Sequence, residues 1–269
     1  MIGGEGGAPA YAGCDGARGE LFSDGNECVR DTMAEDSAVI AGLFSGKGPD
    51  FSALPPAALR LYGLSANAFD AVVHAWMSEL PLAAEITRFG RKVLAAGTAA
   101  ARSAVSVARD GIETAERRAA GLAAADRGDP DVLAVHGAAF KVWREVDRLR
   151  GLLRFAPGEN GVYAARCEPD NFVLPALGPH FQERFGETPW AIIDEKRLLC
   201  LRSVPGGAPE LFSVAENPAP AENLRAARGG EWEDLWRRYH KTINNENRNN
   251  PALQRSFMPK RYWKYLSEL

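Results

Sequence analysis

The sequence has few cysteines and few histidines, and their spacing excludes the common disulfide and metal arrangements. The cysteines are Cys14, Cys28, Cys167 and Cys200, and the histidines are His74, His136, His180 and His240. No Cys-x-x-Cys pair occurs, and no histidine stands at zinc-finger spacing from a cysteine. Cys167 and Cys200 lie in strand-like runs, where a free thiol acts as a small buried hydrophobe. We therefore predict no metal site. Because no glycine-rich phosphate loop follows a predicted strand, we also predict no cofactor.

Long apolar runs and an excess of one charge are also absent. No stretch approaches the roughly 20 apolar residues that a membrane helix needs. The first residues, Met1 to Ala12, have neither the basic start nor the apolar run of a signal peptide. We therefore expect a cytoplasmic protein with no membrane contact. The net charge is only −3, so any binding of nucleic acid requires local segregation of charge.

What is present begins with an acidic, glycine-rich segment over residues 1–52. It carries nine Asp or Glu residues against Arg18, Arg30 and Lys47. We interpret it as a divergent N-terminal arm that is weakly structured, with a short helix near Cys28–Phe44. Such an arm is either a solvated tail or a shield for a basic surface elsewhere in the chain.

Residues 53–150 form the helical part of a main domain that we assign to residues 53–269. Apolar residues recur there at intervals of three and four, which is typical of helices packed on one face. This periodicity predicts helices over Ala66–Ser78, Pro81–Ala96 and Ala99–Ala124.

A fourth helix is predicted from Asp129 and Pro130, which suit the cap and the first position, to about Arg150 before Gly151. Its core side is expected to include Val142, Trp143 and Val146. Its polar stripe is expected to contain Lys141, Arg144 and Arg148.

In the sheet part, residues 151–214, apolar residues recur at every second position, which is typical of strands. Strands are expected over Leu152–Phe155, Val162–Cys167, Trp190–Asp194 and Leu198–Ser203, with a short helix over Leu177–Phe185 and a link over Pro205–Ala219. The C-terminal part, residues 220–269, is expected to form helices over Trp232–Asn244, Pro251–Phe257 and Pro259–Leu266. The predicted fold class is α+β: a helical layer plus a small antiparallel sheet of about four strands, with C-terminal helices.

The C-terminal part is strongly basic and rich in aromatic residues. Between Leu235 and Tyr265 the only acid is Glu246, whereas the basic residues are Arg237, Arg238, Lys241, Arg248, Arg255, Lys260, Arg261 and Lys264. Eight cations minus one anion give a local charge of +7. Phosphates attract Lys and Arg, and unstacked bases pack on flat rings. The segment is therefore a nucleic-acid surface, a solvated face or a docking surface for a protein.

A second basic segment runs from Trp143 to Phe155. Arg144 and Arg148 project together, and Arg150 and Arg154 lie across the junction between helix and strand. Two arrangements are compatible with this pattern. The arginines either contact phosphate or form salt bridges within the chain, Glu145 with Arg148 and Asp147 with Arg144.

Glu168 and Asp170 are weak candidates for catalysis, together with His240. Two carboxylates at a strand end can hold a metal or act as acid and base. Two carboxylates beside Pro169 are also common in turns. No nucleophile–base triad is detectable in the sequence.

Several short motifs stand out in the second half of the chain. The closing motifs are Tyr239-His240-Lys241-Thr242-Ile243, Arg248-x-Asn250-Pro251-x-Leu253-Gln254 and Met258-Pro259-x-Arg261-Tyr262-Trp263-Lys264-Tyr265-Leu266. The central motif is Arg144-Glu145-x-x-Arg148-x-Arg150-Gly151-Leu152-Leu153-Arg154-Phe155. Two further motifs are Pro169-Asp170 and Trp190-Ala191-Ile192-Ile193-Asp194-x-x-Arg197. Together these motifs resemble a bacterial family of DNA repair or DNA metabolism proteins, and the similarity covers about Leu59 to Leu269.

The resemblance implies partners and a context. Members typically occur beside a radical SAM protein thought to act on DNA, and the domain is also fused to uracil-DNA-glycosylase-like modules. Asp147 stands where the family usually has His, and residues 1–52 replace the usual Tyr-Asp-Gly-Ser start. Because no glycosylase-like module is evident, base excision is not carried over to this chain.

The leading hypothesis is a DNA-associated accessory protein of repair or modification. It would hold DNA through Arg144, Arg148, Arg150, Arg154, Lys241, Arg248, Arg255, Lys260, Arg261 and Lys264 while a radical SAM partner does the chemistry. One alternative is a nuclease or glycosylase-like enzyme, which would require Glu168, Asp170 and His240 to converge in one pocket. The other is a protein adaptor that docks through Tyr262, Trp263 and Tyr265.

Overall fold

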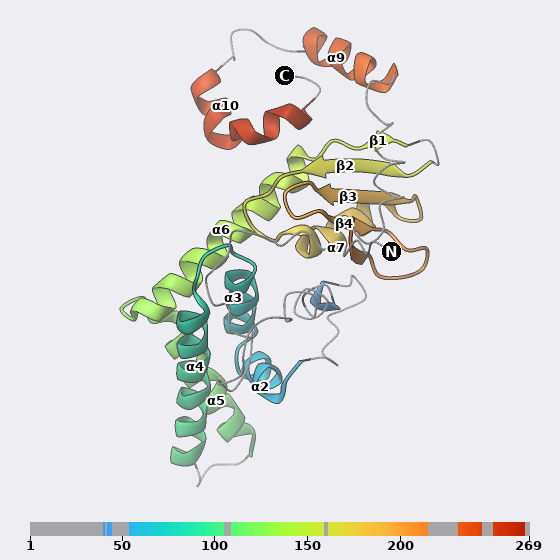
Figure 1. Cartoon of the computed structure of the whole chain (residues 1–269). Helices are drawn as coiled ribbons and strands as arrows, with labels where there is room; N and C mark the ends of the chain where they lie inside the picture. Colours follow the sequence, from blue (N-terminus) through green and yellow to red (C-terminus); the bar gives the residue numbers. More distant parts are fainter. Residues whose placement is uncertain are drawn as a thin grey trace, which may run out of the picture.

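The computed structural model describes residues 40, 42–44, 54–104, 109–158, 161–214, 231–243 and 250–266. Helices from the first half of the chain form one layer, a five-stranded sheet lies beside them, and the C-terminal helices lie along the sheet (Figure 1). The predicted α+β class is confirmed. In the described ranges, every helix is too short or too polar to cross a membrane. The cytoplasmic location stays a prediction.

The helical layer contains α2 (Pro56–Leu64), α3 (Ala66–Trp76), α4 (Ala83–Ser103), α5 (Arg109–Ala125) and α6 (Pro130–Leu152). The predicted break after Ala96 is wrong, because α4 continues to Ser103. At Gly97 an added Cβ would lie 3.0 Å from Cδ1 of Leu64. This glycine therefore permits close packing on α2 instead of ending the helix.

Helix α6 begins where the sequence predicts and joins the two layers. The Asp129 side chain accepts hydrogen bonds from the backbone N–H groups of Asp131 and Val132, at 2.8 and 3.3 Å. These bonds satisfy donors that the first turn leaves free. The helix then runs from the helical layer to the sheet (Figure 1) and ends at Leu152, beyond Gly151.

The sheet contains β1 (Ala156–Pro157), β2 (Tyr163–Cys167), β3 (Trp190–Asp194), β4 (Leu199–Arg202) and β5 (Glu210–Ser213), in sequential order. The predicted antiparallel sheet of about four strands is corrected in three respects. The strand predicted over Leu152–Phe155 is wrong, because α6 continues to Leu152 and the first strand is β1. Strands β2 and β3 pair in parallel, because α7 (Leu174–Phe185) carries the chain back between them. Strand β5 lies inside the predicted link and pairs with β4.

The two faces of the sheet bury different side chains. Ala165, Trp190, Ile192 and Leu201 belong to the main core, whereas Ala164, Ala191, Ile193 and Cys200 form a small cluster on the other face. This alternation is the period-two pattern of a strand. Cys167 and Cys200 are buried free thiols, as predicted. Burial raises the pKa of the Cys200 thiol to about 12.

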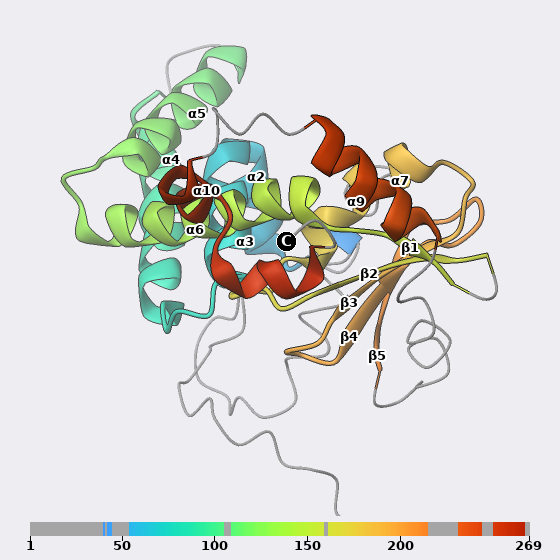
Figure 2. The same cartoon turned by 90° about the horizontal axis from the view of Figure 1, so that it is seen from above.

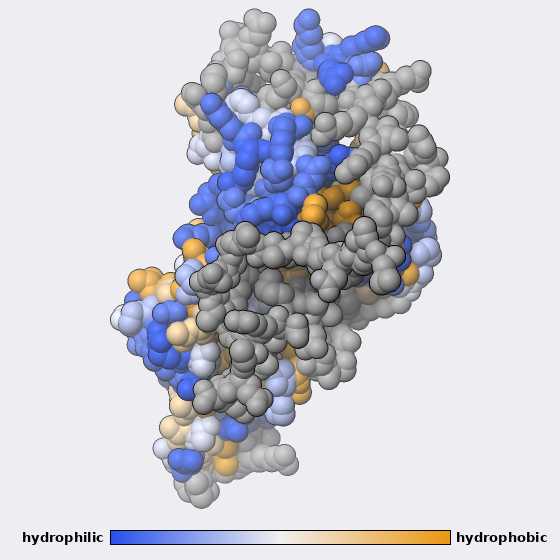
Figure 3. All heavy atoms as spheres, in the orientation of Figure 1, coloured by the Kyte–Doolittle hydropathy of each residue, from blue (hydrophilic) through white to orange (hydrophobic). Residues whose placement is uncertain are grey.

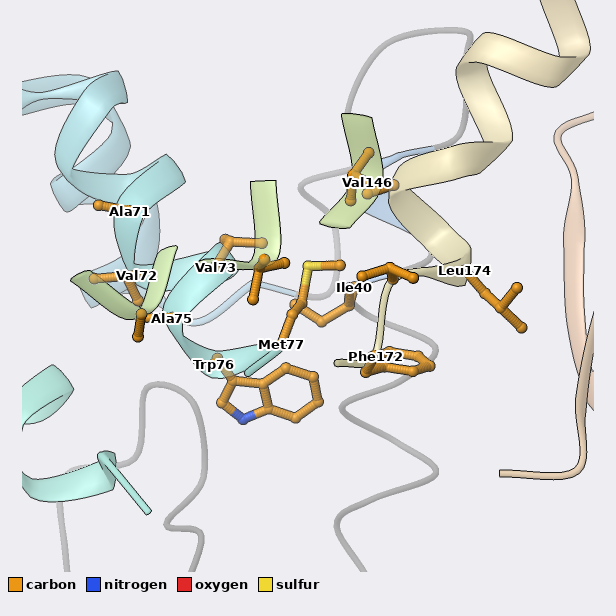
Figure 4. Packing of buried hydrophobic residues seen from close by; sticks show 14 of the residues in the cluster. Ile40, Ala71, Val72, Val73, Ala75, Trp76, Met77, Val146, Phe172 and Leu174 are labelled. Atoms are coloured by element: carbon orange, nitrogen blue, oxygen red, sulfur yellow. The ribbon is translucent and has the colours of Figure 1, made fainter. Parts of the chain in front are cut away.

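The main core is continuous between the helices and the sheet. Met77 at the end of α3 lies beside Ile40 and near Phe172, which precedes α7 (Figure 4). The Phe172 N–H group donates to the Met77 carbonyl at 2.9 Å. Ile40 belongs to the predicted acidic arm yet is fully buried, so this part of the arm contributes to the core. Most of the arm lies outside the described residues.

The C-terminal part forms α9 (Glu231–Ile243), α10 (Pro251–Phe257) and η2 (Lys260–Tyr265), close to the predicted ranges. Element η2 is a 3-10 helix that begins after Pro259. It lies against β2, near the end of α6 (Figure 2). This position sets up the site described next.

Candidate nucleic-acid interface

Glu145 on α6 is the centre of a buried polar network, with only 3% of its surface exposed. Its Oε1 accepts hydrogen bonds from the Tyr262 hydroxyl at 2.5 Å and from the Asp170 N–H group at 2.8 Å. Its Oε2 accepts from the N–H group and side-chain amide of Asn171, at 2.8 and 2.6 Å. Hydrogen bonds to a carboxylate are the stronger kind. One side chain therefore joins α6, the loop after β2 and η2.

Arg261 adds ion pairs to this network. Its Nη2 lies 2.6 Å from the Asp170 carboxylate and 3.3 Å from Glu145, and its guanidinium lies 4.8 Å from the centre of the Tyr262 ring. Burial raises the pKa of Tyr262 above its usual value, and the charge of Glu145 raises it further. The hydroxyl is therefore a permanent donor. We call Glu145, Asp170, Asn171, Arg261 and Tyr262 the clasp.

Further bonds extend the clasp along η2. Lys264 pairs with Glu168 at 2.6 Å, and the Tyr265 hydroxyl donates to Glu195 at 2.7 Å. Burial raises the pKa of Tyr265 above its usual value, and the bond to Glu195 adds to the rise. The whole 3-10 helix is thus held to the body by its polar side chains.

Arg197 supports the loop that the clasp holds. It pairs with the buried Asp194 at 2.7 Å and with Glu79 at 2.5 Å, and it donates to the Asp170 carbonyl at 2.8 Å. Burial raises the pKa of Asp194, while Arg197 opposes that rise. Residues from the central motif, from the Trp190–Arg197 motif and from the closing motif over Met258–Leu266 therefore meet around one loop, residues 168–171.

The outer side of α6 carries cations and rings. Lys141 and Arg144 are exposed, and Arg148 is half-buried. The predicted pairs Glu145–Arg148 and Asp147–Arg144 do not form, because Glu145 points to η2 and the structure gives Asp147 no ion pair with a described residue. The Arg144 guanidinium lies 5.6 Å from the centre of the Phe140 ring instead.

Trp143 is not on the core side of α6, contrary to the prediction. It is 52% exposed, and Phe140 is 57% exposed. Successive residues of a helix are rotated by about 100°. With Val142 and Val146 buried, Trp143 is turned out of the core.

The remaining predicted phosphate ligands are dispersed. Arg150 is half-buried, and its Nε forms no hydrogen bond within the described part of the chain. Arg154 donates to the Gly151 carbonyl at 2.9 Å. Lys241 on α9 and Lys260 on η2 are exposed. Arg248 and the side chains of Arg255 and His240 lie outside the described residues.

The candidate catalytic carboxylates are occupied by the ion pairs of Glu168 with Lys264 and Asp170 with Arg261. Where the structure describes the chain, no three His, Cys, Asp or Glu side chains come close enough to hold a metal ion. The described contacts therefore give a catalytic role no support.

The three rings that the adaptor hypothesis uses are buried or half-buried. Tyr262 is buried, Tyr265 is half-buried, and Trp263 is half-buried with its Nε1 donating to the Met258 carbonyl at 2.8 Å. Exposed apolar side chains occur on the neighbouring helices instead, namely Leu235, Tyr239 and Ile243 on α9 and Leu253 and Phe257 on α10.

The clasp and the outer side of α6 adjoin one another. Arg148 follows Glu145 by three residues, which places it about 60° further around the helix. The surface over η2 and the end of α6 is a continuous hydrophilic region (Figure 3). The Tyr262–Glu145 bond therefore holds η2, with the exposed Lys260, next to the helix that carries Arg144 and Arg148.

Comparison with known proteins places most of this region in one family. Residues 112–268 match the family described as a domain of unknown function, DUF4130. The matched segment contains α6, the sheet, the clasp and the C-terminal helices. No curated protein and no solved structure matches the chain.

Proposed function

The chain belongs to the DUF4130 family, a domain of unknown function, and on that premise we propose that it is a DNA-associated accessory protein in DNA repair or modification. It binds nucleic acid through its Arg- and Lys-rich motifs, while a radical SAM partner carries out the chemistry. The repair context and the partner rest on the resemblance of the motifs.

The observation that supports DNA binding most directly is the contact between η2 and α6. Tyr262 and Glu145 are 117 residues apart in the sequence, yet they form a hydrogen bond of 2.5 Å. This bond holds η2, which begins with Lys260, beside the helix that presents Arg144 and Arg148. A surface with cations from two segments matches a phosphate backbone better than either segment alone.

The ion pairs divide the cations into two roles. Arg261 and Lys264 are neutralised by Asp170 and Glu168, so we assign them to holding η2 in place. Lys141, Arg144 and Arg148 form no ion pair with a residue that the structure describes, and we assign them to phosphate. Cations without an internal partner release the most counterions from DNA.

The test is a salt series with the triple variant Lys141→Ala, Arg144→Ala, Arg148→Ala on labelled duplex DNA. Each phosphate contact contributes about 0.9 to the slope of log K against log salt. We expect the affinity of wild type to fall clearly with salt. In the triple variant, the magnitude of the slope of log K against log salt should be smaller by about 2–3.

A matched control replaces three exposed arginines of the helical layer, Arg91, Arg118 and Arg127, with Ala. It removes the same charge from another surface and should leave the slope close to that of wild type. Absence of wild-type binding even at low salt contradicts DNA association. Equal effects of the two triple variants contradict the α6 surface.

The radical SAM partner has a separate candidate surface on α9. Leu235 and Ile243 are more than half exposed, at positions i and i+8 on one side of the helix. Leu235→Asn should weaken co-purification with the partner after nuclease treatment and leave the salt slope unchanged, because the substitution introduces no charge. Retention of the partner by this variant contradicts docking on α9.

A further inference from the structure

The outer side of α6 contains two exposed rings that phosphate binding does not need. Phe140 and Trp143 are 57% and 52% exposed, and their spacing of three residues makes them neighbours on the helix surface. We infer that this pair, flanked by Lys141 and Arg144, is a stacking site for unpaired bases of single-stranded nucleic acid. The inference rests on the proposed function and specifies its substrate.

The rings are available for stacking. Trp143 forms no ring contact with a described residue. Phe140 stays 57% exposed, although the Arg144 guanidinium lies 5.6 Å from its ring centre. That guanidinium is itself a flat group that stacks on bases. Side chains on a helix lean toward its N-terminus. Gly137, one turn before Phe140, has open space where a Cβ would be, so the helix leaves room beside this ring.

The surrounding charge favours nucleic acid over a protein as the occupant. The centre of a protein interface is usually depleted of charged residues, Lys above all. Here Lys141 and Arg144 alternate with the rings, and Arg148 follows one turn later. A nucleotide needs this combination, because its base packs on a ring while its phosphate meets a cation.

The rings also favour an unpaired strand over a duplex. Bases inside a duplex are covered on both faces by their neighbours, whereas an unstacked base can lie on an aromatic side chain. The clasp holds this part of α6 through the buried Glu145. The rings are therefore carried by a fixed element, which lowers the ordering cost of binding.

The experiment measures the affinity for labelled oligothymidylate, for an abasic strand of equal length and for a duplex. We expect Trp143→Ala to weaken oligothymidylate binding roughly five- to 100-fold, which corresponds to the loss of one base stack. The same variant should bind the abasic strand like wild type and should keep the wild-type salt slope, because no charge is removed.

Three variants provide the controls. Trp143→Phe keeps a flat ring and should retain most of the affinity, whereas Trp143→Leu keeps apolar area without a π face and should behave like Trp143→Ala. Leu122→Ala removes a 66% exposed side chain from α5 and should change nothing. All these side chains are exposed, so unchanged thermal unfolding is expected.

The outcomes separate the stacking site from the proposed function. If wild type binds the abasic strand as tightly as oligothymidylate and Trp143→Ala has no effect, stacking is overturned while DNA association survives. Full affinity in Trp143→Leu overturns stacking in favour of a plain apolar contact. If wild type binds none of the three nucleic acids, both proposals fall together.

Discussion

At Glu145, one carboxylate of α6 accepts hydrogen bonds from two other segments of the chain, the loop after β2 and η2. The donors include the backbone N–H groups of Asp170 and Asn171 and the Tyr262 hydroxyl. Removing this side chain would leave those donors without an acceptor in a site from which water is largely excluded. A buried donor without an acceptor lowers stability. The carboxylate therefore stabilises the fold mainly by accepting these hydrogen bonds and less through its own charge.

We predict that Glu145→Ala lowers the free energy of unfolding by about 3–5 kcal/mol, because it leaves several donors without an acceptor and each unsatisfied buried donor costs about 1–3 kcal/mol. Tyr262→Phe removes a single bond to a charged group and should cost about 1.5–3 kcal/mol. Urea unfolding followed by circular dichroism measures both changes. Glu210→Gln breaks the exposed pair with Arg202 and should cost at most about 1 kcal/mol. Equal losses of unfolding free energy in all three variants would contradict a stabilising role of the clasp.

Asp131 provides a prediction about pH. Hydrogen bonds from Arg88 and then from Lys92 lower the pKa of its carboxyl to about 2, whereas an Asp in an unfolded chain titrates near 3.9. Between these values the unfolded state binds more protons, so stability falls as the pH falls from about 4 to about 2. The stabilisation is present above pH 4.

The free energy of unfolding of Asp131→Asn, measured between pH 2 and pH 6, should therefore differ most from wild type above about pH 4. The difference should shrink toward about pH 2. A gap between Asp131→Asn and wild type that is constant with pH would contradict this assignment.

At the scale of single elements, two helical glycines have opposite surroundings. Gly137 on α6 faces open space, whereas an added Cβ at Gly97 on α4 would lie 3.0 Å from Leu64 Cδ1. Glycine destabilises a helix interior by about 0.5–1 kcal/mol relative to alanine. We predict that Gly137→Ala raises the free energy of unfolding by this amount.

Gly97→Ala should show no such gain, because the new methyl group displaces Leu64. Thermal unfolding of the two variants makes the comparison directly. A gain of equal size at both positions would mean that α2 does not pack closely on α4.

Elements defined by local chemistry could be predicted, and those that depend on distant packing could not. The start of α6 follows from Asp129 and Pro130, and strand β3 from its apolar run. The parallel pairing of β2 with β3 depends on where α7 packs. The residue pattern of the two strands carries no information about that packing. The sequence places Trp143 on the core side because it is large, apolar and next to Val142. In the structure its ring faces outward.

At the scale of the whole molecule, one core joins the helices and the sheet. Phe89 from α4 and Ile192 from β3 belong to the same buried cluster, and α6 runs along both layers (Figure 1). We predict a single cooperative unfolding transition for the described domain. Phe89→Ala should shift it by about 3–5 kcal/mol.

Far-UV circular dichroism and tryptophan fluorescence should give coincident urea curves for wild type and for Phe89→Ala. The first probe reports mainly on the helices, and the second includes Trp190 in the sheet. Separate midpoints for the two probes would show that the layers unfold independently.

The site could be predicted only in part at this scale. The cations and aromatic residues were visible as composition, and the motifs marked Glu145, Asp170, Arg261 and Tyr262. The sequence could not show that these four residues are in contact, because they are far apart along the chain. Glu145 lies 25 residues from Asp170, 116 from Arg261 and 117 from Tyr262. The sequence suggested a local salt bridge for Glu145, and the long-range bonds replace it.

The position of η2 has a consequence for how copies of this protein meet. Strand β1 pairs only with Tyr163 and Ala164 of β2, so residues 165–167 have no partner strand on that edge of the sheet among the residues that the structure describes. Element η2 lies against β2 there (Figure 1). An uncovered strand edge is a template for pairing with another chain. By holding η2 in place, the buried carboxylate on α6 should also keep this edge of β2 from pairing with another chain.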